Sequence, residues 1–94
     1  MKIEWHRLAR LDLIEIVSYI SNDNPDAALR MLDEIERQAE LLRNMPEMGR
    51  PGRCHGTRDL VVAGTAYILP YRIDRDRIVI LRVLHGAQRW PKRF

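Results

Sequence analysis

The sequence predicts an α+β domain in which a helical hairpin packs on one face of a small, mostly antiparallel sheet. Three observations predict this class: a short alternating segment at the start, two helical patterns in the first half, and strand-like runs in the second half. The expected element order is β-α-α-β-β-β. The chain has 94 residues, the length of one domain, so we expect residues 1–94 to form a single domain.

The first expected elements are a strand and a helix. Ile3 and Trp5 alternate around Glu4, which predicts a short strand. From Leu8 to Ile20 the apolar residues recur at helical spacing and widen into a broad stripe. A stripe of that width predicts a helix that is buried on more than one side.

A second helix is expected from Asn24 to about Met45. Asn24 can cap its start, Pro25 suits its first turn, and Pro46 follows its end. A short polar link between the two helices predicts an antiparallel hairpin. Opposite charges four residues apart predict three ion pairs on its outer face: Asp26–Arg30, Arg30–Glu34 and Asp33–Arg37.

The second half of the chain predicts one loop and three strands. Three glycines and two prolines within residues 46–56 predict the loop. Strands are expected over residues 59–62, 67–73 and 78–84, and a charged turn joins the last two. Pro70 cannot donate a hydrogen bond within a sheet, so we expect a bulge or a lost bond beside it.

Composition limits the function classes. The net charge is +3, and the positive charge is almost all arginine, since the chain has only two lysines. Arginine holds phosphate and carboxylate groups through paired hydrogen bonds. Cys54 is the only cysteine, which excludes an internal disulfide and favours a reducing cytoplasm. No apolar run has the length of a membrane span, and no spacing of histidines with Cys54 predicts a metal site.

The candidate site residues stand on or after the expected strands. Arg58, Arg72 and Arg82 can present guanidinium groups from the sheet, and His85 follows the last strand. Arg82 lies among apolar residues and needs a partner, either a ligand or a carboxylate of the chain such as Asp59 or Glu4. His85 can contact a target or transfer a proton, or it can cap the strand end through a backbone hydrogen bond.

Several local pieces together resemble the RelE/ParE superfamily of toxins from bacterial type II toxin–antitoxin systems, and the ParE-like branch in particular. The similarity covers essentially the whole chain. The pieces that carry it are Tyr19-Ile20, Asn24-Pro25, Gly49-Arg50-Pro51-Gly52, Gly56-Thr57-Arg58-Asp59-Leu60, Tyr67-Ile68-Leu69-Pro70-Tyr71-Arg72, the run from Ile80 to Ala87, and Trp90-Pro91.

The resemblance implies a toxin that a cognate antitoxin neutralises, and it leaves two targets open. ParE-like members inhibit DNA gyrase without known hydrolytic chemistry, whereas RelE-like members cleave messenger RNA within the ribosome. This sequence departs from the ribonuclease pattern, because residues 59–62 contain no lysine and Ile68 stands where those enzymes have an arginine. Gyrase inhibition by binding is therefore the favoured hypothesis. The alternatives are a ribosome-dependent endoribonuclease and a non-toxic binding relative.

The same resemblance, with the residue patterns above, assigns candidate roles. As a ribonuclease the chain would use His85, Arg82 and Arg58. An antitoxin segment would contact Leu13, Ile16, Arg50 and Arg53, and a higher-order toxin–antitoxin complex is an open alternative. No cofactor, metal or membrane partner is expected. The candidate target contacts are Arg58, Arg72, Arg82, His85, Gln88 and Arg89.

Overall fold

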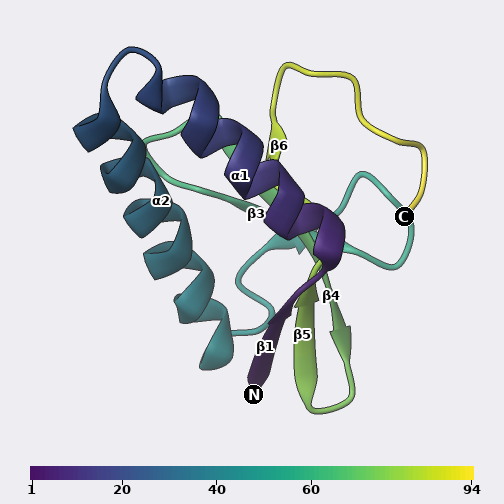
Figure 1. Ribbon diagram of the computed structural model, residues 1–94. Helices are drawn as coiled ribbons and strands as arrows, with labels where there is room; N and C mark the ends of the chain where they lie inside the picture. Colours follow the sequence, from purple (N-terminus) through teal and green to yellow (C-terminus); the bar gives the residue numbers. More distant parts are fainter.

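The computed structural model describes residues 1–94 and confirms the predicted α+β fold, with two helices on a mostly antiparallel sheet. The helices are α1 (Arg7–Ser21) and α2 (Pro25–Glu40), which form the predicted hairpin across the sheet (Figure 1). A 3-10 turn, η1 (Leu41–Arg43), follows α2. The strands are β1 (Lys2–Trp5), β2 (Arg50–Pro51), β3 (Arg58–Val61), β4 (Tyr67–Asp74), β5 (Arg77–Ile80) and β6 (Leu84–His85).

The strands are ordered β1-β5-β4-β3-β2, and β6 pairs with the first residues of β4. All neighbours are antiparallel except β1 and β5, which are parallel with Ile3 opposite Ile78. The strand predicted over residues 78–84 is therefore two short strands, separated by residues 81–83. That part of the prediction was wrong.

Pro70 explains the break, as the sequence led us to expect. The Leu81 backbone N–H donates to the Pro70 carbonyl at 2.8 Å, and Pro70 has no N–H to return. In a strand the N–H and C=O of one residue point to the same side, so the missing donor faces the break. The chain therefore leaves regular pairing at residues 81–83 and resumes it in β6.

The main core lies between the helices and the facing side of the sheet. Its members are small or branched residues of the helices and alternating residues of the strands, so the packing follows the two periodicities that the sequence shows. The buried cluster consists of Ala9, Ile35, Ala39, Leu42, Leu60, Val62, Leu69, Tyr71, Ile78, Ile80 and Val83.

The outer side of α1 is exposed, contrary to the prediction of a helix buried on more than one side. Ala9 is the only fully buried residue of α1. Leu11, Ile14 and Tyr19 are 47%, 63% and 77% exposed. The physical reason is that α2 and the sheet cover α1 from one side, and no other element of the chain crosses its outer side (Figure 1).

Helix α2 begins as predicted but pairs its charges differently. The Asn24 side chain accepts a hydrogen bond from the Ala27 backbone N–H at 3.0 Å, which confirms the cap. The three predicted pairs at four-residue spacing do not form. Two arginines instead pair with the glutamate three residues before them: Arg37 with Glu34, and Arg43 with Glu40. Residues at that spacing are also neighbours on the surface of a helix.

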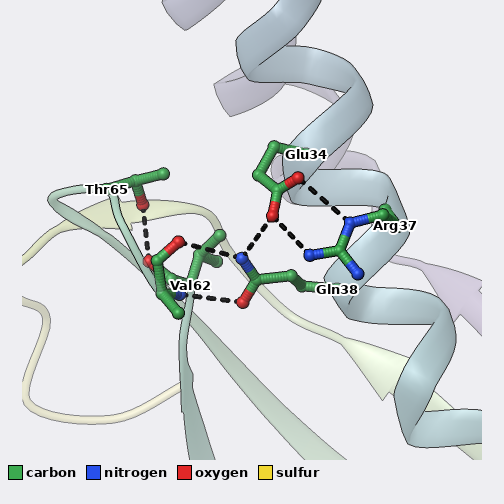
Figure 2. Close-up of polar contacts among 6 residues, drawn as sticks. Glu34, Arg37, Gln38, Val62 and Thr65 are labelled. Atoms are coloured by element: carbon green, nitrogen blue, oxygen red, sulfur yellow. Dashed lines mark hydrogen bonds and ion pairs between the residues drawn. The ribbon is translucent and has the colours of Figure 1, made fainter.

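The side chain of Gln38 joins α2 to the turn between β3 and β4 (Figure 2). Its amide nitrogen donates to the Ala63 carbonyl at 2.9 Å, and its amide oxygen accepts from the Ala63 N–H at 2.8 Å. The same nitrogen donates to Glu34 at 2.7 Å. A buried amide with its partners in place holds this end of the sheet under the helix.

Glu34 provides a test by pH. The hydrogen bond from Arg37, with a further one from Gln38, lowers the pKa of Glu34 from 4.5 to about 2. Because the folded-state pKa is below the unfolded value, the carboxylate stabilises the fold fully above pH 4.5, and this contribution is lost as the pH falls towards 2. In urea unfolding, we expect Glu34→Gln to be less stable than the parent near neutrality and the difference to close on acidification.

The matched control for this measurement is Glu36→Gln, an exposed carboxylate of the same helix without an ion pair. Its unfolding midpoint should follow the parent at every pH. A difference between Glu34→Gln and the parent that stays constant down to pH 2 would contradict the proposed linkage.

Candidate functional site

A hollow of about 360 Å³ lies between α1 and the strand ends at β4 and β6. We call it the α1 hollow. It brings together three predicted target contacts, Arg82, His85 and Gln88, with the predicted antitoxin contact Ile16. Its other lining residues are Asp12, Glu15, Tyr19, Tyr67 and Val83.

Arg82 is held by a carboxylate of α1. Its Nε donates to Asp12 Oδ2 at 2.7 Å, and a terminal nitrogen donates to Oδ1 at 3.0 Å. The side chains of Asp12 and Arg82 are 13% and 25% exposed, so this ion pair is largely shielded. The hydrogen bonds to Asp12 raise the pKa of Arg82, which keeps the guanidinium charged.

The partner of Arg82 differs from the two suggested by the sequence. Glu4 pairs with Arg77 at 2.9 Å, and Asp59 is buried beside the loop, where it accepts a hydrogen bond from the Arg53 backbone N–H. Asp12 was missed because it lies 70 residues from Arg82. A signal was present: Asp12 is an acid placed directly between Leu11 and Leu13, so it needs a partner if that part of the helix packs on the sheet.

Asp12 also holds the strand break in place. The backbone N–H of Val83, within the interrupted segment 81–83, donates to Asp12 Oδ2 at 2.9 Å. One carboxylate thus accepts hydrogen bonds from the side chain of Arg82 and the main chain of the next residue. The break caused by Pro70 is therefore stabilised from α1, and this contact fixes the floor of the α1 hollow.

His85 is exposed, and local hydrogen bonds fix its ring. Nδ1 accepts from the Ala87 backbone N–H at 3.0 Å, which is the strand-end contact that the sequence suggested. When the imidazole is neutral, its proton is therefore on Nε2. The ring packs edge-on against Tyr67 with centroids 5.7 Å apart. The side-chain oxygen of Gln88 accepts from the His85 backbone N–H at 2.6 Å.

The remaining arginine candidates lie outside the α1 hollow. Arg58 donates to the Gly49 carbonyl at 2.7 Å, and the Arg53 guanidinium lies 3.9 Å from the centre of the Trp90 ring. Arg72 lies on β4 in a second hollow, whereas Arg50 on β2 and Arg89 near the C-terminus are exposed. The structure therefore does not join the three proposed ribonuclease residues, because Arg58 lies apart from His85 and Arg82.

The contact of Arg58 belongs to a structural unit around Tyr71. The Tyr71 hydroxyl donates to the Pro46 carbonyl at 2.7 Å and accepts from the Gly49 N–H at 2.9 Å. A Cβ atom at Gly49 would lie 2.6 Å from the Tyr71 ring, so only glycine fits there. Arg58 and Tyr71 together hold the loop before β2 against the sheet.

The charges of the α1 hollow do not favour a phosphate. Asp12 compensates the charge of Arg82, and Glu15 is exposed without an ion pair. Cleavage of RNA needs proton-transfer groups and a cation for the charge that develops on phosphorus. His85 and Glu15 are titratable, but the cation of this hollow is already bound.

Apolar side chains continue from the α1 hollow along the exposed side of α1. We define the α1 strip as Leu8, Leu11, Ile14 and Tyr19, which are 39–77% exposed. Tyr19 also lines the α1 hollow. By contrast, the predicted antitoxin contacts Leu13 and Ile16 are partly buried against the core. A run of exposed apolar residues on one helix is typical of a surface that a partner covers.

No group of three or more His, Cys, Asp or Glu side chains in residues 1–94 is arranged to hold a metal ion. Neither helix has the length and apolar character needed to cross a membrane.

The fold and the α1 strip define a small α+β domain with an uncovered apolar surface, and comparisons with known proteins identify its family as a toxin family. Residues 3–90 match the model of the ParE toxin of the type II toxin–antitoxin system parDE. The chain therefore belongs to the ParE toxin family, within the RelE/ParE superfamily.

Individual relatives agree with this assignment. The chain is 46% identical to a Sinorhizobium fredii protein named "Putative toxin Y4kP", over 97% of this chain and 94% of that one. It is 36% identical to Toxin RelE3 of Caulobacter vibrioides, over 93% and 96% of the two chains. A solved structure, described as the chromosomal ParDE TA system from P. aeruginosa, matches with a TM-score of 0.82 and 30% identity, over 90% and 95% of the two chains.

Proposed function

We propose that this type II toxin inhibits DNA gyrase by binding to it in the cytoplasm. The observation that carries the proposal is the ion pair between Arg82 and Asp12. It occupies the only arginine of the α1 hollow, so the surface around His85 and Gln88 suits protein contact better than phosphate cleavage. The ParE family model and the ParDE structure support the same choice.

The α1 strip is the proposed contact for the cognate antitoxin. It provides apolar area from Leu8 to Tyr19, continuous with the α1 hollow and with the partly buried Ile16. An amphipathic helix or extended segment of the antitoxin can cover such a strip and, from there, restrict access to His85. Arg50 and Arg53 are exposed near the loop before β3, where an acidic part of the same partner can reach them. Assembly into a higher-order toxin–antitoxin complex would use further surfaces.

A supercoiling assay with purified gyrase tests the target. We expect the toxin to abolish supercoiling at saturation, because occupation of the enzyme needs no chemistry from the toxin. Gln88→Ala should weaken inhibition, since it removes a side chain of the α1 hollow and the hydrogen bond to His85. Glu36→Gln is the control and should inhibit fully. Undiminished supercoiling at saturating toxin would exclude gyrase.

The second candidate function is a ribosome-dependent endoribonuclease, and one observation favours it. His85 and Glu15 line the same hollow, so two proton-transfer groups are available. Two Caulobacter vibrioides relatives also carry RelE names. Mapping of messenger RNA ends after induction distinguishes this function: discrete cuts that disappear in His85→Ala would establish it. If cells that express the protein without an antitoxin grow normally, the protein would instead be the non-toxic binding relative.

A further inference from the structure

A second hollow, of about 380 Å³, lies at the start of α1 and is closed by the last residues of the chain. We call it the C-terminal hollow. Four separate parts of the chain line it, and apart from Arg82 it shares no lining residue with the α1 hollow. Its lining residues are His6, Leu8, Arg72, Leu81, Arg82, Pro91, Arg93 and Phe94.

Two arginines of the C-terminal hollow have no acidic side chain as a partner. Arg72 and Arg93 are exposed and take part in none of the five ion pairs, whereas Arg82 is compensated by Asp12. No Asp or Glu side chain lines the hollow, and residues 77–94 contain none. Two free guanidinium groups in a concave site attract an anion more strongly than the same groups on a flat surface.

Part of the lining is apolar: Leu8, Leu81 and Phe94 form one wall of the hollow, beside the polar His6 and Arg82. Leu81 is 5% exposed, Leu8 is 39% exposed and Phe94 is 43% exposed. Pro91 is held nearby, since its carbonyl accepts a hydrogen bond from the Cys54 thiol at 3.4 Å. Figure 1 shows the C-terminal segment beside the loop that contains Cys54. The ligand that fits must therefore combine an anionic group with a flat or apolar body.

We infer that the C-terminal hollow binds a nucleotide unit, with the phosphate between Arg72 and Arg93 and the base against Phe94 and the apolar wall. A phosphate monoester carries a charge of about −1.5 to −2 at pH 7, which matches two guanidinium groups, whereas one carboxylate brings half of that. Exposed aromatic rings bind bases by stacking. His6 accepts the Leu8 N–H through Nδ1, so in its neutral form Nε2 can donate to a phosphate oxygen.

The phosphate and base can belong to a free mononucleotide or to the end of a nucleic-acid strand. One set of titrations distinguishes these two ligands. The full chain is titrated with AMP, with a 5′-phosphorylated hexadeoxynucleotide, with adenosine, with inorganic phosphate and with a glutamate-rich peptide. Backbone amide chemical shifts locate the binding. Saturation by AMP identifies a free nucleotide, and saturation by the strand alone identifies a strand end. Both results support the inference if the shifts cluster at residues 6–8, 72, 81 and 92–94.

Variants test the assigned contacts. Arg72→Gln and Arg93→Gln should each weaken binding about tenfold or more, because each removes a charge-assisted hydrogen bond. Phe94→Ala should weaken it and Phe94→Trp should preserve it. Arg30→Gln removes an arginine of α2 that is also exposed and without an ion pair, and this variant should bind as the parent does. Circular dichroism spectra establish that each variant is folded.

Four results would overturn the inference. They are no saturable binding of either nucleotide probe, equal binding of adenosine and AMP, equal binding of inorganic phosphate and AMP, and tighter binding of the acidic peptide. Because the test uses no gyrase and no antitoxin, its result is independent of the proposed target.

Discussion

Asp12→Ala is expected to lower the free energy of unfolding by about 2–4 kcal/mol, since it leaves a shielded guanidinium and a backbone N–H without their acceptor. Asp12 accepts three hydrogen bonds, two from Arg82 and one from the Val83 N–H. In the Asp12→Ala variant Arg82 stays charged, and its side chain is only 25% exposed. For a domain of this size the loss corresponds to a decrease of about 10–25 °C in Tm.

Urea unfolding followed by circular dichroism measures this loss. Asp33→Ala, which removes an exposed carboxylate of α2 without an ion pair, is the control and should change stability by less than about 0.5 kcal/mol. The double variant Asp12→Ala, Arg82→Leu should recover part of the loss, because it leaves no buried charge unpaired. A parent-like midpoint for Asp12→Ala would show that the ion pair does not stabilise the strand break.

The second large effect is expected at the α1 strip. Ile14→Glu should weaken binding of the cognate antitoxin by more than about 100-fold, because it places an unpaired charge in an apolar contact. Ile14 is 63% exposed, so the folded toxin should lose little stability. In cells, the variant toxin should therefore stop growth even when the antitoxin is present.

Ile73→Glu is the matched control, since Ile73 is also a partly exposed apolar residue but lies on β4. Isothermal titration with the antitoxin should give the parent affinity for this variant. If the antitoxin bound Ile14→Glu as tightly as the parent, the α1 strip would not be its binding surface.

Local sequence signals predicted most elements and one irregularity of the fold, but not β2 inside the expected loop or the division of the last strand. The cap at Asn24 and the missing donor of Pro70 act within a few residues, so their consequences follow from the sequence alone. The residues that line the α1 hollow could be proposed only in part. His85, Arg82 and Gln88 lie within seven residues of one another, whereas their neighbours on α1 come from the other end of the chain.

Two features could not be predicted because they depend on how distant elements meet. The pairing of Asp12 with Arg82 requires α1 to lie over the strand break, which the parallel pairing of β1 and β5 determines. The exposure of Ile14 was not evident either. A helical apolar pattern shows that a side must be covered, but it does not show whether the same chain or a partner covers it.

The parallel pairing of Ile3 with Ile78 has a consequence for synthesis of the protein. During translation the first strand must wait, without its neighbour, until residues 77–80 have left the ribosome. Contacts so distant in sequence form late and slow the folding reaction. The pairing also places α1 over the strand break, so the α1 hollow should be completed late in folding.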